Sequence, residues 1–121
     1  MPKKILLVED DEINLMIAEH ILTRAGYEVS TADNGETAVE QACSAHFDLI
    51  LMDIEMPVMD GVEATARIRS RPEGQAAPIV ALTAHTLPEK LEEFMAAGMN
   101  DYLIKPFDGH KFQPIADKYL I

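Results

Sequence analysis

Three short runs of the chain consist entirely of apolar residues, at residues 5–8, 49–52 and 79–82. Segments with apolar residues at helical spacing follow each of them. A strand without polar residues is typical of a parallel sheet whose two faces are both covered by helices. The alternation of such strands with helices therefore restricts the chain to the α/β class.

The remaining elements follow from weaker patterns of the same kind. Asn34 as a helix cap, Pro88 in a first helical turn and glycine stop signals add to the apolar periodicity. The predicted helices are residues 13–22, a segment after Asn34 that contains Ala38 and Cys43, residues 61–71, a segment from Pro88 to near Gly98, and residues 112–119. Weaker strands are expected at residues 27–32 and 102–104, and a loop at residues 71–75.

The 121 residues suffice for one domain, and we expect residues 1–121 to form a single one. Five strands that alternate with five helices predict a (βα)5 doubly wound parallel sheet, a three-layer sandwich with helices on both faces. In such sheets, ligands bind outside the carboxyl ends of the strands. The residues that follow the strands are therefore the first candidates for a functional site.

The chain is acidic, with a net charge of −11 from 21 acidic and 10 basic residues. Such a balance repels phosphate backbones and anionic lipids, so we expect no direct binding of nucleic acid or membrane. The apolar stretches are shorter than a membrane span, and the first residues do not resemble a signal peptide. The single cysteine, Cys43, cannot form an internal disulfide, which favours a reducing, cytoplasmic location.

Chemically active side chains follow four of the predicted strands. Glu9 and Asp10 follow the first, Asp53 the third, Thr83 the fourth and Lys105 the fifth. Because the carboxyl ends of parallel strands lie at one edge of a sheet, these residues are expected to converge on one site.

This set of groups suits phosphoryl transfer. Gathered carboxylates are ligands for a hard divalent cation such as Mg2+. An aspartate is a competent nucleophile that gives an aspartyl phosphate. A lysine and a hydroxyl then meet the charge on the phosphoryl oxygens.

The residues at these strand ends also match known sequence motifs. From residue 3 to residue 119, the chain resembles a receiver domain of the response-regulator superfamily in two-component phosphorelay signalling. The resemblance implies a flavodoxin-like sheet with strand order 2-1-3-4-5. The matching segments are Leu-Val-Glu-Asp-Asp at residues 7–11, Leu-Met-Asp-Ile-Glu-Met-Pro at 51–57, Asp60-Gly61, Ala-Leu-Thr-Ala at 81–84, and Tyr-Leu-Ile-Lys-Pro-Phe at 102–107.

By this resemblance, Asp53 is the phosphoacceptor and a metal ligand. Asp10 is expected to be a direct Mg2+ ligand and Glu9, which stands where many members have aspartate, a weaker one that binds through water. Glu55 is expected to offer its backbone carbonyl. Lys105 is expected to contact the phosphoryl oxygens.

The resemblance also implies a conformational switch. The Thr83 hydroxyl would bond the phosphoryl group, and Tyr102 would move with it. The peptide bond between Lys105 and Pro106 is expected to be cis, an isomer open to residues before proline. The four histidines have no metal-ligand spacing, although His85 lies near Thr83 and is a candidate for contacting partners.

The expected donor is a phosphohistidine on a histidine kinase or a histidine phosphotransfer protein. The resemblance leaves open a phosphorylation-dependent dimer, and both a freestanding regulator and a receiver from a hybrid sensor histidine kinase. We expect a signalling module and not an enzyme that turns over a separate substrate.

Three alternatives belong to other classes. A phosphatase or hydrolase of similar topology would use an acid two residues after the nucleophile, and Glu55 has that spacing. A degenerate receiver would act by binding alone, but the chain retains all the site residues. A flavodoxin-like cofactor protein is disfavoured because the first strand leads into acids instead of a phosphate-binding loop.

Overall fold

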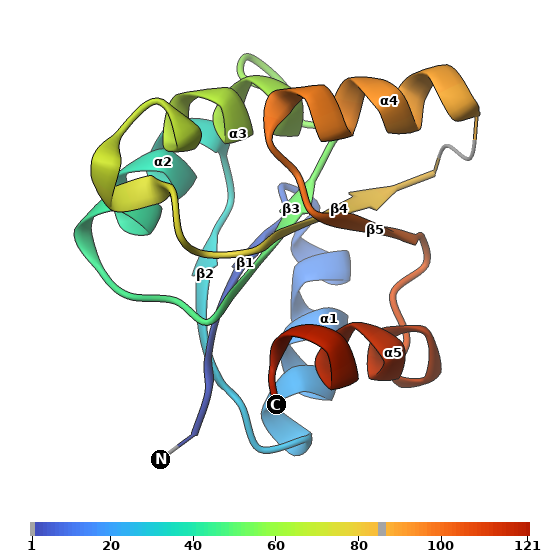
Figure 1. Cartoon of the computed structure of the whole chain (residues 1–121). Coiled ribbons are helices and arrows are strands. Elements are labelled where there is room, and N and C mark those ends of the chain that lie inside the picture. Colours follow the sequence, from blue (N-terminus) through green and yellow to red (C-terminus); the bar gives the residue numbers. More distant parts are fainter. Residues whose placement is uncertain (1, 85–86) are drawn as a thin grey trace.

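The computed structural model describes residues 2–84 and 87–121, and its centre is one parallel sheet (Figure 1). The sheet has five strands in the order β2-β1-β3-β4-β5, as the resemblance implied. The strands are β1 (Lys4–Val8), β2 (Glu28–Ala32), β3 (Leu49–Asp53), β4 (Ile79–Thr83) and β5 (Asp101–Ile104).

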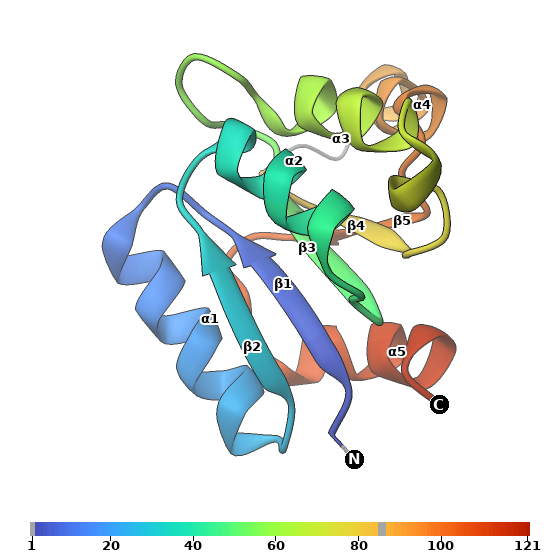
Figure 2. The same cartoon turned by 90° about the vertical axis from the view of Figure 1, so that its left-hand side faces the viewer.

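Helices cover both faces of this sheet and make a three-layer sandwich. Helices α2, α3 and α4 lie on one face, and α1 and α5 lie on the other (Figures 1 and 2). None of the helices in the described residues is long and apolar enough to cross a membrane. The helices are α1 (Glu12–Arg24), α2 (Gly35–Ser44), α3 (Gly61–Arg69), α4 (Pro88–Ala97) and α5 (Gly109–Tyr119), with a short 3-10 helix at Pro72–Gly74.

The alternation of side chains along each strand divides the core in two. In β3, Ile50 and Met52 pack in the core under α2, α3 and α4, whereas Leu49 and Leu51 pack in the core beneath α1 and α5. Because side chains alternate along a strand, the next residue, Asp53, belongs to the α1 and α5 side. Its register partner on β4 is Leu82, which lies in that second core.

The helix ends show where the predictions were right and where they were wrong. The Asn34 side chain caps α2 by accepting from the backbone N–H of Thr37 at 2.8 Å, and Pro88 lies in the first turn of α4, both as predicted. Helix α5 begins at Gly109 and not at residue 112. Asp108 caps it there by accepting from the backbone N–H of Lys111 at 2.8 Å.

Further boundaries differ from the predictions, among them those of α1, which spans Glu12–Arg24 and not residues 13–22. Helix α3 ends at Arg69 instead of residue 71, and part of the predicted 71–75 loop is the 3-10 helix. Strand β2 begins at Glu28 and not at residue 27, because the backbone N–H of Tyr27 donates back to the carbonyl of Leu22 in α1 at 3.2 Å.

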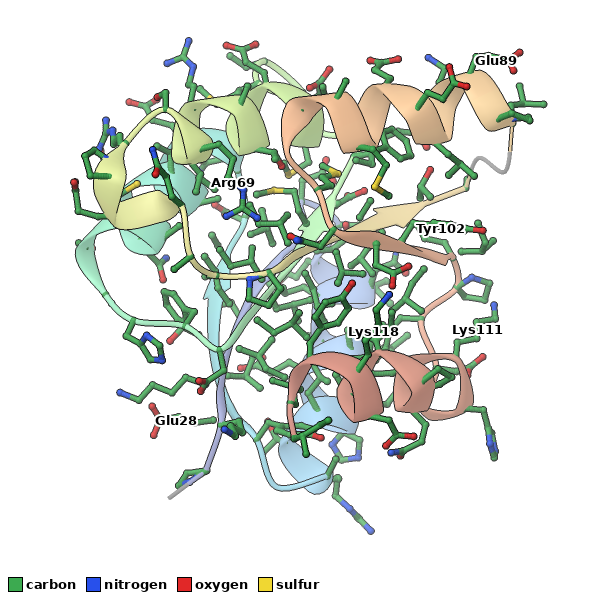
Figure 3. All side chains as sticks on the ribbon, viewed as in Figure 1. Glu28, Arg69, Glu89, Tyr102, Lys111 and Lys118 are labelled. Atoms are coloured by element: carbon green, nitrogen blue, oxygen red, sulfur yellow. The ribbon has the colours of Figure 1, made fainter. Side chains whose placement is uncertain are left out.

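A single arginine ties together the loops at the amino-terminal edge of the sheet. The guanidinium of Arg69, labelled in Figure 3, donates to the backbone carbonyls of Gly98 and Gly74, each at 2.9 Å. It also donates at 2.8 Å to the side-chain oxygen of Asn100, which accepts from the backbone N–H of Ile79 as well. The end of α3 is thereby joined to the loops that precede β4 and β5.

We predict that Arg69→Met destabilises the fold by about 2 kcal/mol, because it leaves two carbonyls and an amide oxygen without their charged donor. The matched control is Arg67→Met, which removes an exposed pair with Glu63 one turn away on the same helix. That loss should be below about 0.5 kcal/mol. Urea unfolding midpoints measure both, and equal losses would contradict a structural role for Arg69.

Candidate functional site

Three carboxylates meet at the carboxyl-terminal edge of the sheet. Glu9 and Asp10 directly follow β1, and Asp53 ends β3, which is the neighbouring strand. Each of the three offers one oxygen, and these oxygens lie within 4.8 Å of one another. Glu9 and Asp53 are buried, at 3% and 1% exposure, whereas Asp10 is exposed. The structure thus brings the predicted acids together but buries Glu9 more deeply than Asp10.

Lys105 brings a positive charge to these acids from the end of β5. Its ammonium nitrogen lies 2.8 Å from Asp53 Oδ1 and 3.6 Å from Glu9 Oε2. The Lys105 backbone N–H donates to the carbonyl of Thr83 at 2.8 Å, which ties the residue to the end of β4. Lys105 therefore stands between two buried carboxylates as their shared counter-charge.

The protonation of these groups is strongly perturbed. Burial, together with hydrogen bonding and charge from Asp53, raises the pKa of Glu9 to about 8, and Lys105 offsets only part of this rise. The pKa of Asp10 is also raised, first by desolvation and then by Asp53. Burial lowers the pKa of Lys105, but Asp53 and Glu9 outweigh that effect and leave it raised.

The acids fit a hard divalent cation. Buried oxygens that lack a hydrogen-bond partner are uncommon in proteins. Two of them, Glu9 Oε2 and Asp53 Oδ2, have no such partner among the described residues. Close carboxylate oxygens of this kind are the donors that Mg2+ takes in partly hydrated sites.

The other predicted residues surround the acids in different ways. Thr83 is fully buried at the end of β4. Glu55 is exposed, and its backbone N–H donates to Asp53 Oδ1 at 3.2 Å. Tyr102 lies on β5 opposite Ala81 and is 37% exposed. The peptide bond between Lys105 and Pro106 is cis, as the resemblance implied. His85 lies outside the described residues.

One acid of the run at residues 9–12 has a local role that the sequence reading missed. Asp11 caps α1, because its Oδ1 accepts from the backbone N–H groups of Ile13 and Asn14 at 2.9 and 3.0 Å. An aspartate just before a helical segment is a recognised cap signal, so this role was readable from the sequence.

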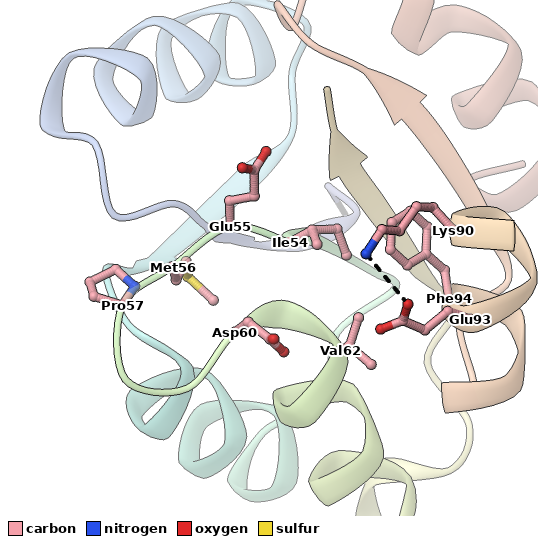
Figure 4. Close-up of a pocket in the computed structure, with 9 residues that line it drawn as sticks. All are labelled: Ile54, Glu55, Met56, Pro57, Asp60, Val62, Lys90, Glu93 and Phe94. Carbon is pink, nitrogen blue, oxygen red and sulfur yellow. Dashed lines mark ion pairs between the residues drawn. The ribbon is translucent and has the colours of Figure 1, made fainter. Parts of the chain in front are cut away.

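Two pockets lie beside residues of the candidate site. One of about 270 Å³ is lined by Glu9, Asn14 and Lys105 together with apolar residues of α1 and the β5–α5 loop. The other, of about 480 Å³, opens between the β3–α3 loop and α4 (Figure 4). Glu55 is one of the residues that line it. Lys90 and Glu93, which also line it, form an ion pair of 3.8 Å along α4.

A (βα)5 sheet that gathers three carboxylates and a lysine at one edge is the arrangement expected of a receiver domain. In agreement with this, the response regulator receiver domain family matches residues 5–116. Because the match covers most of the chain, the chain belongs to the response regulator receiver domain family.

Two known proteins similar to the chain differ greatly in length. The two-component response regulator ORR41 of Oryza sativa subsp. japonica is 44% identical over 120 residues, which cover 96% of this chain and 93% of that protein. The signal transduction histidine-protein kinase BarA of Escherichia coli (strain K12) is 38% identical over 115 residues. These cover 95% of this chain but only 12% of the kinase.

A solved structure agrees over nearly the whole chain. It is the receiver domain of sensor histidine kinase PA1611 from Pseudomonas aeruginosa PAO1, which is 42% identical and has a TM-score of 0.91. The alignment covers 99% of this chain and 98% of that one. That structure has a magnesium ion coordinated in its active-site cleft.

We predict that the metal-free protein loses stability as the pH rises from about 5 to 8. Because the pKa of Glu9 is raised from 4.5 to about 8, the folded state holds a proton that the unfolded state releases. The contribution of this proton to the free energy of unfolding is therefore fully present below the unfolded-state pKa of Glu9. It is lost as the pH approaches 8.

Urea unfolding in the presence of a metal chelator, repeated between about pH 5 and pH 8, measures how the free energy of unfolding changes with pH. Glu9→Gln should flatten this slope and, at pH 8, stabilise the protein by several kcal/mol, because the pKa of Glu9 rises from 4.5 to about 8 and each pKa unit corresponds to about 1.4 kcal/mol. Glu12→Gln removes an exposed acid of the same run and should leave the slope unchanged. A wild-type slope in Glu9→Gln would contradict this account.

Proposed function

We propose that Asp53 accepts a phosphoryl group from a phosphohistidine of a partner protein. The observation that supports this proposal is that the two carboxylate oxygens of Asp53 differ in their contacts. Lys105 holds Oδ1 at 2.8 Å, whereas Oδ2 has no hydrogen-bond partner among the described residues. A carboxylate held by one oxygen presents the other as a nucleophile in a defined direction.

The transfer is a substitution at phosphorus. An Asp53 oxygen forms a bond to phosphorus as the bond from phosphorus to the histidine nitrogen breaks. The electron pair of that bond returns to the imidazole, and the product is an aspartyl phosphate. Lys105 then meets the charge on the phosphoryl oxygens, which is the main contribution a protein makes to phosphoryl transfer.

The carboxylates of Glu9, Asp10 and Asp53 would hold Mg2+, with the backbone carbonyl of Glu55 as a further ligand. When bound, the ion supplies positive charge that offsets the repulsion between the acids and the incoming phosphoryl group. The burial of Glu9 and its short distance from the other two acids support a more direct part for this residue than the sequence suggested.

Thr83 and Tyr102 are proposed as the switch. Thr83 lies at the end of β4, in register with Ile104, the residue before Lys105. Tyr102 is on the same strand as Ile104, two residues earlier, and therefore on the same face of the sheet. Contacts of the Thr83 hydroxyl that differ between the two states would shift their equilibrium, and the half-exposed Tyr102 would carry the change to the surface.

An apolar patch beside the acids supports docking of a partner. Ile13, Met16 and Ile17 of α1 are 69%, 62% and 50% exposed, and their spacing places them on one face of the helix. Ile17 also lines the pocket that contains Glu9 and Lys105. We propose that a histidine kinase or histidine phosphotransfer protein packs on this patch and presents its phosphohistidine to Asp53. The domain would signal without turnover of a separate substrate.

The phosphoacceptor is tested by incubating the protein with acetyl phosphate and Mg2+. The wild type should form an acid-stable, base-labile adduct visible by intact mass, whereas Asp53→Asn should form none because an amide is not a nucleophile here. Asp33→Asn, which changes an exposed aspartate, should label like the wild type. An adduct of equal yield on Asp53→Asn would remove Asp53 from the proposal, and sustained hydrolysis of phosphate esters would favour the hydrolase alternative.

The docking patch is tested by the double variant Met16→Gln/Ile17→Gln. Transfer from a phosphorylated partner protein should slow by about tenfold, which corresponds to about 1.4 kcal/mol of lost apolar contact. Uptake from acetyl phosphate should stay within about twofold, because exposed substitutions change stability little. Met95→Gln on α4 is the exposed apolar control. Equal slowing with both donors would show that the patch does not bind the partner.

A further inference from the structure

A second lysine lies against the loop that carries Lys105. Lys111, in the first turn of α5, extends back toward this loop at the end of the helix (Figure 3). Its ammonium donates to the backbone carbonyl of Ile104 at 3.3 Å and to that of Pro106 at 3.1 Å. These are the residues immediately before and after Lys105, so Lys111 binds the backbone on both sides of it.

The ammonium of Lys111 is itself held in place. A lysine ammonium has three N–H donors, and two of them are used by the two carbonyls. The carboxylate of Asp108 lies 3.9 Å away and also caps the helix at the Lys111 backbone N–H. The Lys111 side chain, 40% exposed, therefore joins the helix cap and the loop in one connected group.

The position of Lys111 is unfavourable by the ordinary rule for helices. Cations are disfavoured in the first turn, where the helix dipole is positive. The first turns of α1, α2, α3 and α4 each contain a glutamate, whereas that of α5 contains no acid. The two carbonyls and the Asp108 carboxylate offset the unfavourable dipole at Lys111.

Lys111 is one of several contacts that hold the loop, which also include the packing of the Phe107 ring against Phe112 with centroids 5.6 Å apart. Pro106 has no N–H to donate. The Lys105 N–H donates to the carbonyl of Thr83 in β4, and Lys111 binds the carbonyls of the residues before and after Lys105. We propose that Lys111 is a positioning residue, which fixes this loop so that the Lys105 ammonium stays within bonding distance of Asp53. The inference rests on the proposed role of Lys105 in phosphoryl transfer.

The test is a double-mutant cycle on phosphoryl uptake from acetyl phosphate with Mg2+. Lys111→Met, which keeps the apolar stem, should slow uptake by about tenfold, because displacements of about 1 Å at a reacting site have effects of this size or larger. In a Lys105→Met background, the same substitution should change the rate by less than about twofold, since Lys111 acts through Lys105. Lys111→Arg, which keeps the charge and the donors, should restore most of the rate.

The matched control is Lys118→Met. Lys118 is another lysine of α5, and this change removes its ion pair with Asp101. It should leave uptake near the wild-type rate. Equal slowing by Lys111→Met and Lys118→Met, or the same slowing with and without Lys105, would overturn the positioning role. If Lys105→Met itself left the rate unchanged while Asp53→Asn abolished labelling, the role of Lys105 would be wrong, and the Lys111 proposal would be overturned with it.

Discussion

The ion pair of 2.8 Å between Lys105 and Asp53 is the contact on which the functional edge depends. Parallel strands place their carboxyl ends at the same edge of the sheet. Here the ends of β1 and β3 bring the carboxylates, and the end of β5 brings the lysine that pairs with them. Carboxylates removed from water repel one another and lose hydration. Lys105 contacts both buried acids, and removing it would leave the Asp53 carboxylate without its paired cation. A bound cation or phosphoryl group would therefore change the balance of charge between these acids and Lys105.

The opposite edge of the sheet handles polar groups differently. Asp48 accepts from the backbone N–H of Lys4 at 2.8 Å and lies 3.1 Å from His46, and these donors hold its pKa below the usual range. At the other edge, burial and the neighbouring Asp53 outweigh the opposing effects of Lys105 and Asn14, and the pKa of Glu9 is raised to about 8. The carboxylate of Asp48 thus stabilises the amino-terminal edge, whereas the ionised carboxylate of Glu9 would destabilise the carboxyl-terminal edge. Strain of this kind is expected where the structure serves function more than stability.

Lys105 is on a loop, whereas Asp53, the proposed phosphoacceptor, ends a strand. Strand β3 is fully buried and pairs with β1 and β4, so the backbone of Asp53 is fixed by the sheet. Lys105 is fixed by local contacts to Thr83 and, through its neighbours, to Lys111. Changes in the β5–α5 loop would therefore alter the pairing at Asp53 without disturbing the sheet. This separation suits the proposed switch, in which the functional edge changes state while the core stays intact.

The sequence by itself determined the class of fold and the membership of the site. Uniform apolar runs report burial on both faces, and the residues after such runs must meet at one edge, so Asp53, Lys105 and the two acids after β1 were predictable. Local signals also identified Asn34 and Pro88 at the helix starts. Each of these features depends on spacing along the chain, which the sequence shows directly.

Only the tertiary structure decided how the site groups are balanced. It buried Glu9 and exposed Asp10, brought the Arg69 side chain to Gly98, 29 residues away, and turned Lys111 toward the loop beside Lys105. It also placed the start of α5 at Gly109, where Asp108 caps the helix. Such contacts depend on the directions and distances between packed elements. Periodicity identifies which face of an element is buried, but it contains no information about which distant side chain that face will meet.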